Sequence, residues 1–229
     1  MEKTDDVLAE GPHYMPDNVG FVELLGVFGD DLTVVNAARV SLAKESTEFT
    51  ERDGNLIRYL ANHDHLSPFF HPQLRFRIKM PLFVAREWYR HTVGFSRNEV
   101  SRRYVDTPPQ CWTPSAASLR QRSASIKQGS KSEEVDDADN WSERVQEFTR
   151  QSCVFYQELL AANVAPEVAR TVLPQSMYTE FIETASLYAY IRLIKLRSSP
   201  DAQIEIKLYA DAIMAFLYKH FPKSFVAFF

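Results

Sequence analysis

The stretch that decides the fold runs from Gln73 to Tyr104 and reads QLRFRIKMPLFVAREWYRHTVGFSRNEVSRRY. Its first seven residues, Gln73 to Lys79, alternate polar with apolar side chains, which predicts a strand. Pro81 suits the first turn of a helix, and the following LFVAREWYRH predicts that helix. Gly94 to Glu99 is expected to be a loop, and Arg102 to Val105 is expected to be extended. A strand followed at once by a helix indicates a protein of mixed α and β structure.

The residues before this stretch also contain both kinds of element. Residues 1–15 are expected to be a flexible tail. Gly20 to Phe28 is rich in β-formers and predicts a strand, and a helix is expected from Leu32 into the AARVS segment. Arg52 to His63 carries apolar residues at helical spacing and predicts a second helix. His65 to Pro72 contains two prolines and is therefore expected to be a loop.

The second half of the chain is expected to be mainly helical. Residues 115–139 are polar and nearly free of large apolar side chains, so they are expected to be a surface insertion. The 229 residues suffice for one compact domain or two small lobes, and we expect one domain over residues 1–229. The fold class is α+β, with a mixed or antiparallel sheet packed by helices. Helices are predicted over Trp141 to Asn163, Pro166 to Val172, much of Tyr178 to Arg197, and Ala202 to His220.

Composition restricts the partners and the compartment. A net charge of −4 and a pI near 5.9 argue against a nucleic acid as the main partner. Two cysteines exclude a disulfide framework and favour a reducing compartment. The acidic N-terminus does not resemble a targeting peptide, and no apolar run reaches the roughly 20 residues that span a bilayer. The expected location is the cytoplasm, without a membrane contact.

A cluster of five arginines marks the candidate site. Guanidinium groups bind phosphate through two oxygens at once, and aromatic rings stack on planar heterocycles. The cluster therefore predicts a site for a small anionic ligand, although a solvated helix face with a few ion pairs has a similar pattern. The arginines are 86, 90, 97, 102 and 103, interleaved with Trp88, Tyr89, Phe95 and Tyr104.

Three other chemistries are conceivable for these residue types. His63, His65 and His71 could form a metal cluster, but a Pro-bounded loop favours a structural or cofactor-lining role, so no metal is expected. Cys111 could be a nucleophile, but no histidine is near it in sequence, which favours a semi-buried thiol without a catalytic role. Ser101 could also be a nucleophile, but only His91 near it could act as its base, so Ser101 is expected to be a phosphate or nucleotide ligand.

Six ordered segments resemble flavin-dependent thymidylate synthases. The family pattern Arg-His-Arg, spacer, Asn-Glu-x-Ser-x-Arg-Tyr is similar to Arg90-His91-Thr92 followed by NEVSRRY at residues 98–104. Thr92 replaces the second arginine, and the spacer is one residue longer. In the family, Asn, Arg, Asn and His are common where this chain has Ser186, Tyr188, Arg192 and Asp201. The resemblance spans Gly20 to Phe229, with further matches in HDHLSPFFHP, PLFVAREWYRH, EVARTVLP, MYTEF and IKLRSSPDAQIEI.

The resemblance implies a fold, a reaction and an assembly. The fold is that of the thymidylate synthase-complementing proteins, assembled as a homotetramer whose active sites are shared between subunits. The reaction is reductive methylation of dUMP to dTMP, with carbon from 5,10-methylenetetrahydrofolate and hydride from FAD reduced by NADPH or NADH. No G-x-G-x-x-G motif follows a strand, so FAD would be held by side chains rather than by a Rossmann turn.

The resemblance also assigns residues. Arg197 is the catalytic residue, activating the uracil ring, and His65 lines the folate or flavin ring. The implied dUMP contacts are Glu87, Trp88, Tyr89, Arg90, Glu99, Val100, Ser101, Arg102, Arg103, Arg170 and Arg197. The implied FAD contacts are Ser67, Arg90, His91, Thr92, Glu99, Ser186, Tyr188 and Arg192.

One alternative belongs to a different class of protein. A non-catalytic, mostly helical interaction protein could use the arginine and aromatic cluster to bind an acidic partner. Uptake of flavin by the purified protein distinguishes the two hypotheses, because only the enzyme requires it.

Overall fold

The computed structural model describes residues 10–105, 107–123 and 130–229. Their contacts divide them into two compact units. Unit 1 comprises the described residues up to Ile78 together with 89–98 and 181–229. Unit 2 comprises 79–88 and the described residues of 99–180. Each unit is described by itself below.

Seven strands and eight helices cover most of the described residues. The strands are β1 (Glu10–Tyr14), β2 (Phe21–Phe28), β3 (Gln73–Pro81), β4 (Phe95–Glu99), β5 (Arg120–Arg122), β6 (Ser130–Glu134) and β7 (Tyr178–Ser186). The helices are α1 (Asp31–Arg39), α2 (Glu51–Asn62), α3 (Leu82–Trp88), α4 (Ala138–Ala161), α5 (Pro166–Ala169), α6 (Leu187–Arg197), α7 (Ile204–His220) and α8 (Pro222–Phe228). The α+β prediction is therefore confirmed.

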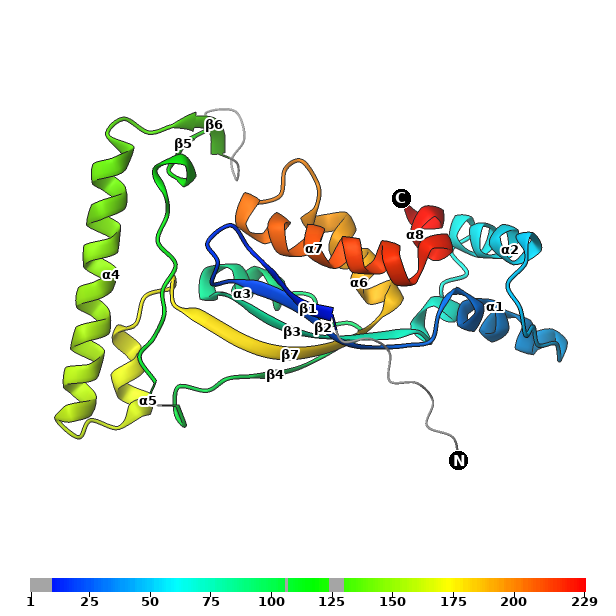
Figure 1. The fold of residues 1–229 in the computed structure, drawn as a ribbon, viewed down its shortest axis with the longest axis horizontal. Coiled ribbons are helices and arrows are strands. Elements are labelled where there is room, and N and C mark those ends of the chain that lie inside the picture. The colour runs from blue at the N-terminus through cyan, green and yellow to red at the C-terminus, as the bar shows by residue number, and fades with distance from the viewer. Residues whose placement is uncertain (1–9, 106, 124–129) are drawn as a thin grey trace. The chain divides into compact units, whose positions relative to one another are not determined.

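A five-stranded sheet in the order β1-β2-β3-β7-β4 organises the chain. β1 and β2 are antiparallel, with His13 opposite Val22 and Tyr14 opposite Phe21. β3 owes its place to its alternating sequence, because Leu74, Phe76 and Ile78 are all fully buried while the residues between them are not. In unit 1, α7 packs against β2 and α6 packs against α7 (Figure 1).

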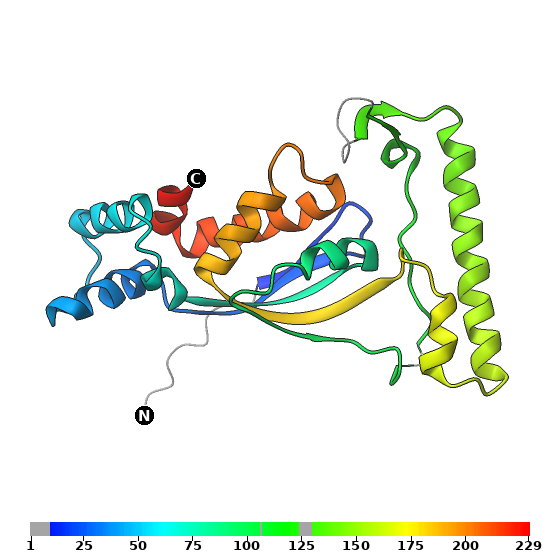
Figure 2. The same cartoon turned by 180° about the vertical axis from the view of Figure 1, so that it is seen from behind.

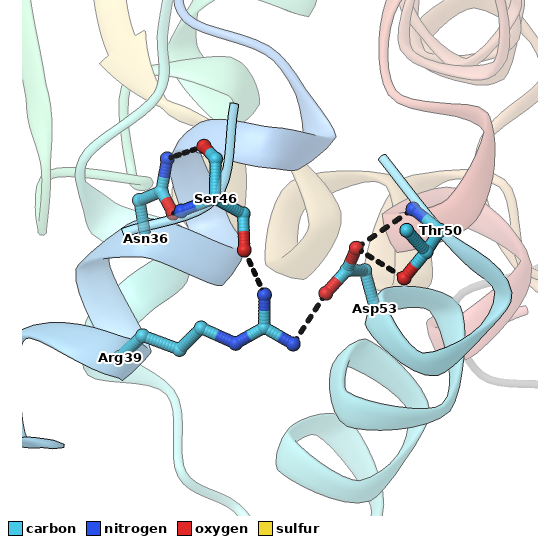
Figure 3. Close-up of polar contacts among 5 residues, drawn as sticks. All are labelled: Asn36, Arg39, Ser46, Thr50 and Asp53. Carbon is cyan, nitrogen blue, oxygen red and sulfur yellow. Dashed lines mark hydrogen bonds and ion pairs between the residues drawn. The ribbon is translucent and has the colours of Figure 1, made fainter. Parts of the chain in front are cut away.

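Three helices of unit 1, namely α1, α2 and α8, pack at one end of it (Figure 1). The side chain of Asp31 joins α1 to α8, because it accepts hydrogen bonds from the backbone N–H groups of Lys223 and Ser224 and from the Ser224 hydroxyl. A second buried carboxylate, Asp53 of α2, accepts two hydrogen bonds of 2.7 Å from Thr50 and pairs with Arg39 of α1 at 2.5 Å (Figure 3).

Unit 2 contains the long helix α4, which packs along α5 (Figure 2). Tyr156 of α4 is buried, as is Ala169 at the end of α5. β5 and β6 form a two-stranded antiparallel pair. Cys111 forms a single β-bridge with Met177, and the sulfur atoms of Cys111 and Cys153 lie 3.5 Å apart.

Several sequence predictions need correction. The helix expected over much of Tyr178 to Arg197 begins only at Leu187, because Tyr178–Ser186 alternates buried with less buried side chains and forms β7. Phe95–Glu99 is strand β4 rather than loop. Residues 102–104 form a turn rather than an extended segment. Pro81 ends β3 instead of starting a helix.

Other boundaries also differ. The helix expected over LFVAREWYRH ends at Trp88, where the chain turns. Residues 67–70 within the expected loop form a short 3-10 turn, and α8 was not foreseen. Residues 10–14 of the expected tail form β1, and residues 1–9 lie outside the described residues. The expected insertion holds β5, β6 and the start of α4, and its residues 124–129 lie outside the described residues.

Candidate functional site

A pocket of about 350 Å³ in unit 1 is formed by two segments that are far apart in the sequence. One segment is the turn between α3 and β4, and the other is helix α6. Four of its lining residues were predicted flavin contacts and a fifth was the predicted catalytic arginine. The lining residues are Arg90, His91, Thr92, Val93, Phe95, Ala189, Arg192, Leu196 and Arg197.

A glycine allows the turn to approach α6. Gly94 has a φ of +84°, a conformation that residues with a Cβ atom rarely adopt. A Cβ atom at this position would lie 3.1 Å from the Cβ of Ala189 and 3.3 Å from the Oγ of Ser186. Both the backbone conformation and the close packing therefore require glycine, which fixes how the turn faces the helix.

The turn and the helix are joined by a hydrogen bond between side chains. Arg197 Nε donates to His91 Nε2 across 3.0 Å. Burial lowers the pKa of His91 to about 4, and the charges of Arg197, Arg97, Arg192 and Arg90 contribute to the shift in the same direction. The imidazole is therefore neutral at pH 7, and its Nε2 is available to accept the hydrogen bond that Arg197 donates.

Arg97 contacts the turn that lines the pocket, and the sequence had placed it in the arginine cluster without a specific role. Its Nε donates to a carboxylate oxygen of Glu183 on the neighbouring strand β7, and its Nη1 donates to the backbone carbonyl of His91 at 2.6 Å. Its guanidinium group also lies 4.6 Å from the ring centre of Phe95 and 5.4 Å from that of Tyr89. Glu183 was missed because its segment was expected to be helix.

The predicted nucleotide contacts are divided between the two units. Tyr89, Arg90 and Arg197 belong to unit 1, and the others belong to unit 2. In unit 2, Arg103 pairs with Glu167 of α5 at 3.5 Å, and its backbone N–H donates to the Ser101 hydroxyl at 3.3 Å.

The remaining nucleotide contacts of unit 2 differ in exposure. Arg170 is exposed in the 3-10 turn that follows α5. Val100 and Glu99 are exposed, and the Glu99 carboxylate accepts a hydrogen bond from the Thr179 hydroxyl. Trp88 is fully buried, so only its backbone could reach a ligand, whereas Glu87 is half-buried.

Unit 2 also has a pocket of about 490 Å³, in which Arg102 lies. The Arg102 guanidinium donates to the Thr107 carbonyl, which holds it toward the proline-containing segment. Lys79 and Gln110 line the same pocket, and the sequence had predicted a role for neither.

The other predicted flavin contacts of unit 1 have structural partners. The Ser186 hydroxyl is buried and caps α6, accepting the Ala189 N–H at 3.2 Å. The Tyr188 ring packs against Phe70 and Phe228 at 5.3 and 5.7 Å. Ser67 is exposed at the start of a 3-10 turn.

The histidine segment is held by an aromatic contact. The ring of His63 stacks on Tyr59 at 4.1 Å, and exposed His65 lies 6.0 Å from the same tyrosine ring. Among residues 10–105, 107–123 and 130–229, no group of three or more His, Cys, Asp or Glu side chains could hold a metal ion.

Cys111 lies beside the second thiol of the chain. Burial raises the pKa of Cys111 to about 12, and the hydrogen bond and charge of Cys153 contribute to the rise. This thiol is protonated at neutral pH, which is unfavourable for a nucleophile.

In the part of the chain that the structure describes, no helix is long and apolar enough to cross a membrane.

Comparison with known proteins places these features in a family. The family model of the thymidylate synthase complementing proteins matches residues 23–223. A flavin-dependent thymidylate synthase of Thermus thermophilus is 39% identical over 220 residues, which cover 96% of this chain and 79% of that protein. The enzyme of the same name from Thermosipho africanus is 37% identical over 212 residues, covering 91% of this chain and 90% of that protein.

A solved structure is similar in fold as well as in sequence. The UMP/dUMP methylase PolB of Streptomyces cacaoi bound with 5-Br dUMP superposes with a TM-score of 0.82 at 31% identity, covering 90% of this chain and 93% of that one. The motif-carrying residues Arg90 to Tyr104 lie inside the matched family region. The chain therefore belongs to the thymidylate synthase complementing proteins, the enzyme family of the flavin-dependent thymidylate synthases.

Proposed function

We propose that this chain makes dTMP from dUMP by reductive methylation. The carbon donor is 5,10-methylenetetrahydrofolate, the cofactor is FAD, and the electron source is a reduced nicotinamide, NADPH or NADH. The observation that carries the proposal is the unit 1 pocket, which gathers Arg90, His91, Thr92, Arg192 and Arg197 from segments about 100 residues apart. Family membership favours this enzyme over a non-catalytic protein that binds an acidic partner.

The residues of the pocket fit a flavin nucleotide. Arg90 and Arg192 offer planar cations to a pyrophosphate, while Phe95 and Leu196 offer apolar surface to a ring. A volume of about 350 Å³ is room for part of FAD, and further contacts would come from Ser67, Glu99, Ser186 and Tyr188. Bound FAD would supply the hydride that reduces the transferred one-carbon group. His65 is assigned to the edge of the folate or flavin ring.

Arg197 is assigned to activation of the substrate ring. Methylation at C5 of uracil places negative charge on the ring, and a cation held near N3 and O4 stabilises that charge. The hydrogen bond to neutral His91 fixes the Nε side of the Arg197 guanidinium, so the group is oriented before the substrate binds. Because an arginine keeps its proton, this role is electrostatic and involves no proton transfer.

The phosphate of dUMP requires guanidinium groups and hydrogen-bond donors. Ser101, Arg103 and Arg170 are assigned to it, with Arg90 near the same group. Glu87, Tyr89, Val100 and Arg102 are assigned to the rest of the nucleotide, together with Glu99 and the backbone of Trp88. We expect a homotetramer, as the resemblance to flavin-dependent thymidylate synthases implies, and active sites shared between its subunits would explain how 229 residues host three large ligands.

A second substrate is suggested by the solved relative. The Streptomyces cacaoi protein is a methylase of UMP as well as of dUMP, so 5-methylation of UMP is the alternative reaction for this chain. The two substrates differ only in the 2′-hydroxyl group of the ribose.

One experiment tests the proposal and separates the substrates. The purified protein is supplied with FAD, methylenetetrahydrofolate, NADPH and equal amounts of dUMP and UMP, and the methylated products are quantified by mass spectrometry. We expect dTMP as the main product and a flavin absorbance band on the protein. 5-methyl-UMP as the main product would support the alternative, and flavin binding without either product would refute both reactions.

A further inference from the structure

A largely buried ion pair contacts the turn that lines the pocket. Arg97 of β4 is 14% exposed, and its ion-pair partner Glu183 of β7 is fully buried. Both are therefore largely removed from water, which is unfavourable for an isolated charge but tolerated when the charges pair and form hydrogen bonds. The strands that carry them are neighbours in the sheet.

The Arg97 guanidinium makes two directed contacts at once. Its Nε donates to Glu183, while its Nη1 donates to the carbonyl of His91 at 2.6 Å. The flat faces of Tyr89 and Phe95 lie beside it at 5.4 and 4.6 Å, which limits its movement. The rigid, planar fork of a guanidinium group holds its donors in fixed directions toward two acceptors, which the single flexible ammonium group of lysine does not.

Hydrogen bonds therefore hold both the backbone carbonyl and the imidazole ring of His91. Its backbone carbonyl is bound by Arg97, and its imidazole accepts the hydrogen bond of Arg197 at 3.0 Å. The charges that face the imidazole come from every element around it: Arg90 from the turn, Arg97 from β4, and Arg192 and Arg197 from α6. The four cations favour the neutral ring, which is the form that can accept from Arg197.

We propose that Arg97, fixed by Glu183, is a positioning residue: it holds the His91 turn so that the imidazole orients the guanidinium group of Arg197. The proposal rests on the role proposed above for Arg197. Arg97 occupies the lengthened spacer between the Arg90–Thr92 turn and Asn98, so the spacer carries the residue that fixes the turn. Arg97 itself is assigned no contact with substrate.

The test uses variants that do not leave a buried charge without its ion-pair partner. Arg97→Met alone would leave the buried Glu183 carboxylate without its ion-pair partner, so the principal variant is Arg97→Met with Glu183→Gln, which is neutral and close in volume. Arg97→Lys keeps the positive charge but lacks the planar guanidinium group. The control is Arg150→Met with Glu147→Gln, an exposed ion pair of α4. Thermal unfolding establishes that each variant is folded.

Three readouts separate positioning from a purely structural role. In the folded double variant, kcat for dTMP formation should fall roughly 100-fold while the KM for dUMP changes by less than about threefold, because a misplaced group weakens the transition state more than binding. The kcat of Arg97→Lys should fall by a similar factor. The acid limb of the pH–rate profile should move to higher pH, because Arg97 lowers the pKa of His91, whereas Glu183, neutralised with it, is not among the groups that shift that pKa.

The third readout does not depend on turnover. The pKa of His91, followed by NMR in the ligand-free protein, should rise in the double variant and stay unchanged in the control. An unchanged kcat and an unchanged His91 pKa in a folded double variant would overturn the proposal. If the parent enzyme forms no dTMP, the proposed function fails, while a rise in the His91 pKa still shows that Arg97 governs this histidine.

Discussion

Arg197 Nε lies 3.0 Å from His91 Nε2 and donates a hydrogen bond to it, although the two residues are 106 positions apart in the sequence. An arginine cannot accept a proton here, so the histidine nitrogen must be the acceptor and the ring must be neutral. The orientation of the candidate catalytic residue Arg197 therefore depends on the protonation state of His91. This dependence leads directly to a prediction about pH.

Stability should decrease as the pH falls from about 6.5 to about 4. His91 has a pKa of about 4 in the folded protein and an ordinary value near 6.5 in the unfolded chain. Between these values the unfolded state binds more protons, so the free energy of unfolding decreases with decreasing pH and levels off below the folded pKa. Urea unfolding of the parent and of His91→Gln at a series of pH values measures this. If both proteins lose stability equally across the window, the low pKa of His91 is wrong.

Arg103→Ala should raise the KM for dUMP more than any other single change on the proposed phosphate side. The guanidinium group is half exposed and pairs with a similarly exposed Glu167 at 3.5 Å, a weak interaction that a phosphate dianion would replace. Steady-state kinetics over a range of dUMP concentrations measures the effect. Glu167→Gln is the matched control and should leave KM within about threefold. Equal KM increases in both variants would indicate a structural pair instead of a phosphate ligand.

Cys111→Ala should retain activity within a few-fold of the parent. Burial and the neighbouring Cys153 raise the pKa of the Cys111 thiol to about 12, so almost no thiolate exists at neutral pH. The measurement is the rate of dTMP formation, with Cys153→Ala as the control for lost packing. Loss of turnover in Cys111→Ala alone would indicate a nucleophilic cysteine.

Asp53→Asn should destabilise the fold by about 2 to 3 kcal/mol, because it removes the charge that Arg39 pairs with and weakens two hydrogen bonds from Thr50. Burial alone would raise the pKa of Asp53, but the Thr50 hydrogen bonds and the Arg39 charge outweigh it and hold the pKa below its usual value. The stabilisation is therefore present at neutral pH and lost as the pH falls through the folded pKa.

Chemical unfolding measures the loss of stability in Asp53→Asn. An exposed ion pair of α7 provides the control. Asp211 pairs with Lys207 at 2.9 Å, but both side chains are more than a third exposed. Asp211→Asn should cost less than about 1 kcal/mol. Similar losses for the two variants would show that the cluster of Figure 3 contributes no more than a surface pair.

Much of the fold could be predicted from local pattern. The alternation in QLRFRIK identified β3, and the polar and apolar spacing after Trp141 identified most of α4. β7 was missed because it runs directly into the helix-forming sequence LYAYIRLIKLR. The strand and the following helix were therefore predicted as one helical segment. Its strand conformation is set by pairing with neighbours that are distant in sequence, which local propensity does not contain.

Residues of the candidate site could be named from the sequence, but their arrangement in space could be predicted only in part. Arg90, His91, Thr92, Arg192 and Arg197 all line the unit 1 pocket, and their roles as flavin or nucleotide contacts stay predictions. The ion pair of Arg97 with Glu183 could not be foreseen, because it depends on β4 lying beside β7 and both strands had been assigned to other conformations. The sequence signals that this region differed were Thr92 in place of the second arginine and a spacer longer than the family pattern.

The most direct test of the account is dTMP formation by Arg197→Ala under saturating FAD, folate and NADPH. We predict that flavin remains bound while the rate falls by a factor of roughly 100 to 1000, since removing one well-placed electrostatic group costs about 3 kcal/mol. Arg58→Ala, an exposed arginine of α2, should keep the parent rate. An Arg197→Ala enzyme that forms dTMP at the parent rate would contradict the account.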